Sequence, residues 1–143
     1  MISLKNTLEA IKEKLSGHDA SIKALSVDYI VEQGTSGIWT YRKWNSGIAE
    51  CWGRKTWSSP VAVTTSWGGI CESSSQSNIE YPSNLFIESP VLTMFGTTAT
   101  KGALLAIEVE GDYADKIPKY WFTRGASGNP VPVVSIHAIG RWK

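Results

Sequence analysis

The sequence of 143 residues predicts a mainly β protein that begins with a short helix, and two observations support this prediction. Residues 1–25 carry apolar side chains at alternating spacings of three and four residues, which is the heptad pattern of a coiled coil. After residue 26 the helix-forming residues give way to Trp, Tyr, Thr, Val, Ile, Ser and Gly, which favour short strands separated by turns. We therefore expect a coiled-coil stalk over residues 1–26 and an all-β head domain over residues 27–143.

The heptad predicts self-association. An apolar seam this narrow is buried only against copies of itself. Leu8 followed by Ile11 favours three or four strands, whereas Ile22 followed by Leu25 favours two, and we expect a homotrimer. The alternative is a single amphipathic helix that packs on its own head domain. The expected oligomer interface comprises Leu4, Leu8, Ile11, Leu15, His18, Ile22 and Leu25, with Met1 at the first a position.

The seam contains one polar residue, His18, at a d position. Our first interpretation is a tolerated polar residue that fixes the register, and the second is a pH-sensitive or anion-holding group in the stalk core. The adjacent Gly17 destabilises the helix by about 1 kcal/mol relative to Ala, so the helix is marginal on its own.

The head domain is expected to be an antiparallel sandwich or a barrel-like fold. Asn45, Ser46 and Gly47 separate two strand-like runs, and a short loop containing Gly is typical of a hairpin. The Ser-rich residues 68–84 show no periodicity and are interpreted as a surface loop. Strands do not alternate with helices, which disfavours Rossmann-type and TIM-type enzymes. The expected strands are residues 27–33, 37–44, 48–52, 61–67, 85–87, 91–95, 103–109, 120–123 and 131–139.

Composition argues against several classes of protein. The formal net charge of +1 lacks the basic excess of a nucleic-acid-binding surface. No apolar stretch approaches the roughly 20 residues of a membrane span, and no signal-peptide pattern is present, so we expect synthesis in a cytoplasm. Cys51 and Cys71 do not form a metal-binding pair, and we expect buried free thiols, with a single disulfide as the alternative. We expect neither a metal nor a cofactor.

The sequence indicates no catalytic centre. His18 lies in the stalk and His137 lies in an apolar strand, so neither is paired with a candidate nucleophile. The acidic run over residues 108–115 lacks the spacing and the glycine of an EF-hand and is interpreted as a solvated turn. We therefore expect a non-enzymatic protein. Paired carboxylates for glycoside hydrolysis stay an open alternative, because their spacing is spatial rather than sequential.

Tryptophan is the strongest compositional signal, with seven in the chain and five between residues 39 and 67. Indole offers a flat apolar face and one N–H donor, which suits sugar rings, subunit interfaces and sheet cores. Trp39 and Tyr41 share one face of the first hairpin and Trp44 lies on the other, as expected if one face packs inward and the other meets a neighbouring subunit. We expect most tryptophans in the core or in such an interface. Trp57 and Trp67 lie beside turns and are expected to be exposed, and the predicted ligand surface consists of Arg54, Trp57, Trp67 and Tyr81.

Two stretches carry a family resemblance. Residues 30–53, IVEQGTSGIWTYRKWNSGIAECWG, and residues 133–143, VVSIHAIGRWK, resemble the C-terminal domains of tail-fibre or minor structural proteins from phages and prophages of Gram-positive and gut bacteria. The resemblance covers residues 27–143 and is less distinctive in the middle. It implies a trimeric fibre tip in which a coiled-coil stalk ends in a compact β domain. No binding residue is carried over, because the resembling stretches look structural.

The expected function follows from the stalk, the head and the resemblance together. We expect a homotrimeric receptor-binding protein of the virion tail fibre, made in the host cytoplasm, which recognises a bacterial surface polymer, in first place a glycan. Other tail or baseplate proteins are further expected partners, and nucleic acid and membrane insertion are not expected. One alternative is a purely structural fibre or head-decoration protein without its own ligand. A second is a glycan-degrading enzyme of the tailspike kind.

Overall fold

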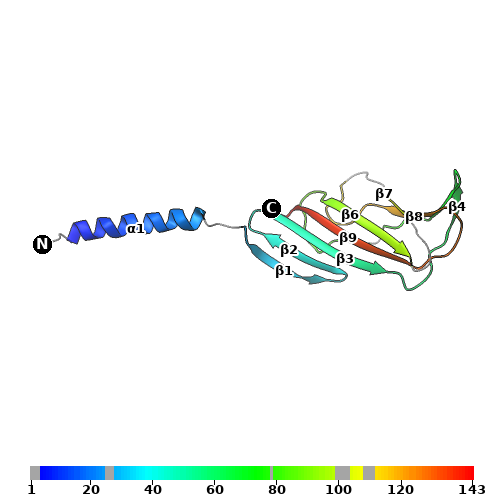
Figure 1. Ribbon diagram of the computed structural model, residues 1–143, viewed down its shortest axis with the longest axis horizontal. Coiled ribbons are helices and arrows are strands. Elements are labelled where there is room, and N and C mark those ends of the chain that lie inside the picture. The colour runs from blue at the N-terminus through cyan, green and yellow to red at the C-terminus, as the bar shows by residue number, and fades with distance from the viewer. Residues whose placement is uncertain (1–3, 25–27, 78, 99–103, 108–111) are drawn as a thin grey trace.

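The computed structural model describes residues 4–24, 28–77, 79–98, 104–107 and 112–143. The helix α1 (Leu4–Ala24) comes first and is followed by two antiparallel sheets (Figure 1). This confirms the mainly β fold with one short N-terminal helix. Met1 and Leu25 of the expected interface lie outside the described residues, as do Glu108 and Glu110 of the acidic run.

The larger sheet has five strands, and all neighbouring pairs run antiparallel. The hairpin predicted at residues 45–47 joins its second and third strands, and Gly47 adopts a φ of 95°, which favours glycine. Asp28 holds this turn from outside, since its carboxylate accepts hydrogen bonds from the amide and hydroxyl of Ser46. In spatial order the strands are β1 (Ile30–Ser36), β2 (Trp39–Trp44), β3 (Ile48–Thr56), β9 (Pro132–Arg141) and β6 (Val91–Thr98).

The smaller sheet has four strands and covers one face of the larger one (Figure 1). Its first two strands form a hairpin around Gly68 and Gly69, whose φ values of 53° and 91° suit the left-handed turn that matches strand twist. This hairpin lies at the end of the head that is farthest from α1 (Figure 1). In spatial order the strands are β4 (Val63–Trp67), β5 (Ile70–Ser73), β8 (Tyr120–Arg124) and β7 (Leu104–Ile107).

The core lies between the two sheets. Alternate residues of β3 and β9 point inward, so that Ala49, Cys51 and Ile136 are buried while their chain neighbours are not. From the smaller sheet, Tyr120 and Phe122 are fully buried, and their rings meet edge to face at 5.8 Å. Most of the sandwich is therefore held by packing across one continuous apolar layer.

Two expectations for the middle of the chain are wrong. The expected loop over residues 68–84 contains β5 and two core side chains, Ile79 and Tyr81. The expected strand over residues 85–87 is instead irregular and follows a turn over residues 82–85, in which the Leu85 amide donates to the Pro82 carbonyl and Asn84 adopts a φ of 56°. Leu85 and Phe86 are nevertheless buried, because this turn closes one side of the core.

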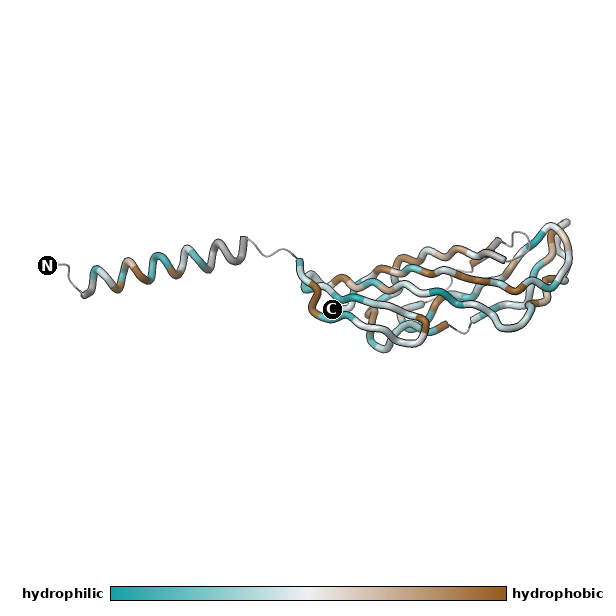
Figure 2. Tube along the Cα trace, turned by 60° about the horizontal axis from the view of Figure 1, so that its bottom comes forward, coloured by the Kyte–Doolittle hydropathy of each residue, from teal (hydrophilic) through white to brown (hydrophobic). Residues whose placement is uncertain are grey.

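The helix α1 lies apart from both sheets (Figures 1 and 2). Of its seam residues, Leu8, Ile11 and Leu15 are 56%, 50% and 61% exposed. The single chain thus leaves these three seam residues uncovered, in contrast to the alternative in which α1 packs on its own head, and the side chains of Leu4 and Ile22 lie outside the description. The homotrimer stays a prediction that this exposed seam supports. Among the described residues, no helix is both long and apolar enough to cross a membrane.

Candidate ligand-binding site

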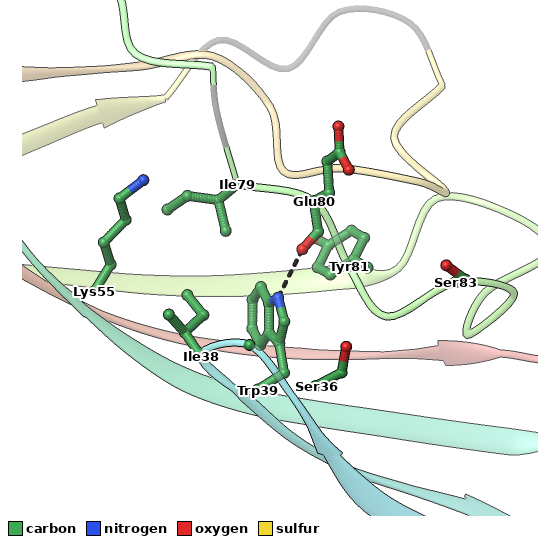
Figure 3. A pocket seen from close by; sticks show the side chains of 9 residues that line it. Ser36, Ile38, Trp39, Lys55, Ile79, Glu80, Tyr81 and Ser83 are labelled. Carbon is green, nitrogen blue, oxygen red and sulfur yellow. Dashed lines mark hydrogen bonds between the residues drawn. The ribbon is translucent and has the colours of Figure 1, made fainter.

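A pocket of about 340 Å³ opens beside the turn between β1 and β2 (Figure 3). Its volume falls at the lower end of the range for small-molecule sites. We call it the Trp39 pocket. It is lined by Ser36, Gly37, Ile38, Trp39, Lys55, Ile79, Glu80, Tyr81 and Ser83.

A glycine on β3 allows the turn to fold close to the sheet. A Cβ at Gly53 would lie 2.6 Å from the Ile38 carbonyl oxygen and 3.1 Å from the Trp39 ring. Gly37, at the tip of the turn, adopts a φ of 58°, where a residue with a side chain is strained. The two glycines therefore determine where Ile38 and Trp39 stand at the pocket wall.

Trp39 joins β2 to the segment that forms the opposite wall. Its indole is buried, and its Nε1 donates a hydrogen bond of 2.6 Å to the Glu80 carbonyl (Figure 3). Its ring also lies 5.5 Å from that of Tyr81 in a tilted arrangement. The segment is fixed from its other side, because the Tyr81 backbone amide donates to the Asp115 carbonyl and the Ile117 amide donates to the Ile79 carbonyl. The pocket is consequently held in shape before any ligand arrives.

The polar groups of the pocket carry both charge signs. Lys55 and Glu80 contribute a cation and a carboxylate, and Ser36 and Ser83 contribute hydroxyls (Figure 3). The Lys55 Nζ also lies 5.2 Å from the centre of the Trp57 ring, which places an aromatic face beside the pocket. Hydroxyls, one cation and one carboxylate beside apolar walls suit an uncharged, hydroxyl-rich ligand better than a strongly charged one.

The structure does not gather the four predicted ligand residues into one surface. Tyr81 lines the Trp39 pocket, but it is only 6% exposed. Arg54 is exposed on the opposite face of the sheet from its neighbour Lys55, because side chains alternate along β3. Trp57 is half-buried, with its ring 5.3 Å from that of Phe122. Trp67 is the last residue of β4, beside the Gly68–Gly69 turn of the β4–β5 hairpin, and its side chain lies outside the described part of the structure.

Tyr81 supports the site through packing. Its ring meets Phe86 edge to face at 5.1 Å, and among the described residues no hydrogen-bond partner faces its hydroxyl. Burial, with a smaller contribution from the nearby Cys51, raises the pKa of the Tyr81 phenol above its ordinary value. The hydroxyl is therefore turned into the core, and the ring face is the part of Tyr81 that shapes the pocket.

Sequence reasoning missed several residues of the Trp39 pocket. Lys55 could have been found, because alternation along the strand places it on the same face as Cys51. Ile79, Glu80 and Ser83 gave no such signal, since they belong to a segment without periodicity.

A second pocket of about 310 Å³ adjoins the first, and Glu80 and Asp115 both line it. Both residues are exposed, whereas the proton donor of a glycosidase is placed in an apolar surrounding. Across the part of the chain that is described, no group of three or more His, Cys, Asp or Glu residues is placed to hold a metal ion. His137 lies on the outside of β9 with its Nε2 3.2 Å from the Glu50 Oε2.

Both cysteines are free thiols, as the sequence predicts, but the predicted burial holds for Cys51 and not for Cys71. Cys51 is fully buried, and burial, followed by the nearby Glu50 carboxylate, raises its pKa to about 12. Cys71 is half-buried. A thiol with so high a pKa is a poor nucleophile at neutral pH, and Cys51 therefore acts as a core side chain.

Comparisons of the whole chain with protein-family models, curated proteins and solved structures find no match.

Proposed function

We propose that the protein is the tail-fibre tip of a phage or prophage, a non-enzymatic homotrimer that binds a bacterial surface polymer, in first place a glycan. The observation that carries this proposal is the combination of an exposed heptad seam on α1 with an all-β head that bears a preformed pocket. The sequence resemblance to phage fibre domains points in the same direction. The protein then belongs to the virion and contacts other tail or baseplate proteins through its stalk.

The chemistry of the Trp39 pocket supports a sugar ligand. Ser36, Ser83 and Lys55 offer groups that hydrogen-bond to sugar hydroxyls, while Ile38 offers an apolar surface for a sugar ring. A pocket of this size holds about one sugar unit and binds it weakly. Three pockets on one stalk raise the overall affinity by up to about 10²–10⁴, provided that the polymer spans them.

The experiment uses the full chain on a microarray of bacterial cell-wall and capsular polysaccharides. Lys55→Met removes the cation of the pocket, and Arg54→Met is the matched control because it removes the adjacent cation on the opposite face of the same strand. We expect wild type and Arg54→Met to bind the same polysaccharides and Lys55→Met to lose at least tenfold in apparent affinity. Sedimentation checks that each variant keeps the oligomeric state of the wild type.

The same experiment distinguishes the alternatives. Loss of binding by Arg54→Met alone would move the ligand surface to the outer face of the sheet and refute the Trp39 pocket. An array without hits, together with failure to label intact cells, would favour a purely structural fibre or head-decoration protein. Shortened polysaccharide chains after incubation would support the enzyme alternative, and the exposed Glu80 and Asp115 of the second pocket would then be the first carboxylates to test.

A further inference from the structure

The outer face of the five-stranded sheet carries large exposed apolar side chains among polar ones such as Arg42, Glu50 and Ser135. It is the face turned away from the smaller sheet, and its large exposed side chains include Val91 and Phe95, which are 72% and 66% exposed. An antiparallel sheet with one solvated face normally carries polar residues there. Contiguous exposed apolar side chains mark an interaction surface. The remaining exposed aliphatic residues of this face are Ile30, Ile48 and Ile139.

The strand register divides the outer face into two unlike halves. Over β6 and β9, Val91 lies directly opposite Ile139, and Phe95 lies four residues farther along β6 on the same face, opposite Ser135. Over β2 and β3 the face is aromatic and charged, with the Arg42 guanidinium 5.0 Å from the centre of the Trp52 ring. The Glu50–His137 pair separates the two halves.

We infer that the outer face is the surface through which the heads of neighbouring copies of this chain pack in the trimer. The inference rests on the homotrimer of the proposed function and extends it from α1 to the head. The occupant is a second copy: the half over β6 and β9 of one copy, with Val91, Phe95 and Ile139, packs on the Trp52 half of the next. A three-fold assembly requires two different, complementary patches on each copy, and the outer face provides both. Trp and Arg are also the residue types that contribute most to binding at such interfaces.

The exposed seam of α1 brings the outer faces together. Only six Cα–Cα steps connect Ala24 to Ile30, which limits their separation to about 22 Å. When three helices join along their seams, the near ends of the three heads are therefore held close to the common axis. Ile48, Val91 and Ile139 lie at that near end of the head, because the strands that carry them begin or end there (Figure 1). The apolar residues of the face are thus close to where the seam ends.

The areas also favour a contact beyond the helix. The 21 residues of α1 span about 31 Å, and one helix face of that length and about 10 Å width offers about 300 Å². A stable interface needs about 800 Å² from each partner. Five strands about 4.8 Å apart, each presenting about eight residues at 3.3 Å, give the outer face about 600 Å². Shared between the two neighbours in a trimer, the seam alone offers about 150 Å² to each interface, and the seam with the outer face offers about 450 Å².

The test measures the oligomeric state of the full chain by sedimentation velocity over a dilution series. The variant combines Val91→Glu with Phe95→Glu, and the matched control combines Ile70→Glu with Ile107→Glu, which are exposed on the other sheet. We expect trimers for wild type and control, and a trimer that dissociates at a concentration at least 100-fold higher for the variant. Val91→Asn combined with Phe95→Asn changes no charge and is expected to weaken the trimer in the same sense.

The outcomes distinguish a failure of the outer-face contact from a failure of the homotrimer. A variant that dissociates at the same concentration as wild type overturns the outer-face contact and leaves the helical trimer intact. A wild-type chain that is monomeric at every concentration refutes the homotrimer itself. Thermal unfolding followed by circular dichroism verifies that the variants fold. If the glutamate pair does not fold, the single variant Phe95→Ser replaces it in the same test.

Discussion

Replacing Leu8 and Leu15 by alanine tests the stalk, and its effect follows from the exposure of these side chains. Both are more than half exposed in the single chain, so a coiled coil would bury what remains. Full burial of a leucine side chain contributes about 2 kcal/mol. Association would bury only the exposed part of each leucine, and the alanine that replaces it keeps part of that burial, so the loss of association free energy is about 1 kcal/mol per leucine. For the six leucines of a trimer the loss is about 6 kcal/mol, or about 10⁴-fold in the association constant.

The concentration at which half of the chains dissociate varies as the square root of a trimer's dissociation constant. The double variant should therefore dissociate at a concentration about 100-fold higher than wild type. Sedimentation equilibrium resolves this, because three copies of a 15.6 kDa chain give about 47 kDa. Alanine keeps the helix propensity, and Asn6→Ala with Glu13→Ala provides a control away from the seam.

The result that would refute the reasoning is specific. If α1 packs on its own head, Leu8→Ala with Leu15→Ala lowers the melting temperature of the head and leaves the oligomeric state unchanged. If α1 forms the stalk, the melting of the head is unchanged while the trimer weakens. Tryptophan fluorescence follows the head alone, since all seven tryptophans lie beyond residue 38.

Three further outcomes are expected. Gly53→Ala should lower the free energy of unfolding, measured by urea titration, by about 1–3 kcal/mol, because the new Cβ would lie 2.6 Å from the Ile38 carbonyl oxygen. The control Gly125→Ala should leave it unchanged, since no heavy atom lies within 4 Å of its new Cβ. Equal urea midpoints for the two variants would contradict the close approach at Gly53. A thiol reagent at pH 8 should label the half-buried Cys71 and leave Cys51 unmodified until the chain unfolds. Labelling of both cysteines at the same rate would show that the sandwich opens around Cys51. Stability should fall as pH rises above 9, because the pKa of Cys51 is about 12 in the folded chain against 9.0 for an exposed cysteine, so the unfolded chain loses this proton first. Cys51 contributes a slope of up to about 1.4 kcal/mol per pH unit, and the buried Tyr81 and Tyr120 act in the same sense. A urea midpoint that stays constant between pH 8 and 11 would contradict this prediction.

The placement of Lys55 illustrates how much of the site was within reach of the sequence. The first hairpin was predicted from its turn residues, and alternation from Trp39 onward gives the inner and outer faces of β2 and β3. What the sequence lacked was the opposite wall of the pocket, because residues 79–83 are held by hydrogen bonds to residues 115 and 117, far along the chain. Tyr81 was predicted to belong to the ligand surface, and the closure of residues 79–83 on Trp39 makes it a core residue.

The sequence by itself determined the helix with its heptad seam, the change to strands after it and the antiparallel class of the head, because these depend on local periodicity and turn residues. Tertiary structure decided which strands are neighbours and which face of each sheet is covered. Thus β5 arises in a Ser-rich stretch with no pattern of its own, since its pairing with β4 and β8 supplies the hydrogen bonds that define it. In the same way the exposed side chains of Val91 and Phe95 became visible as one surface only when β6 was placed at the edge of the five-stranded sheet.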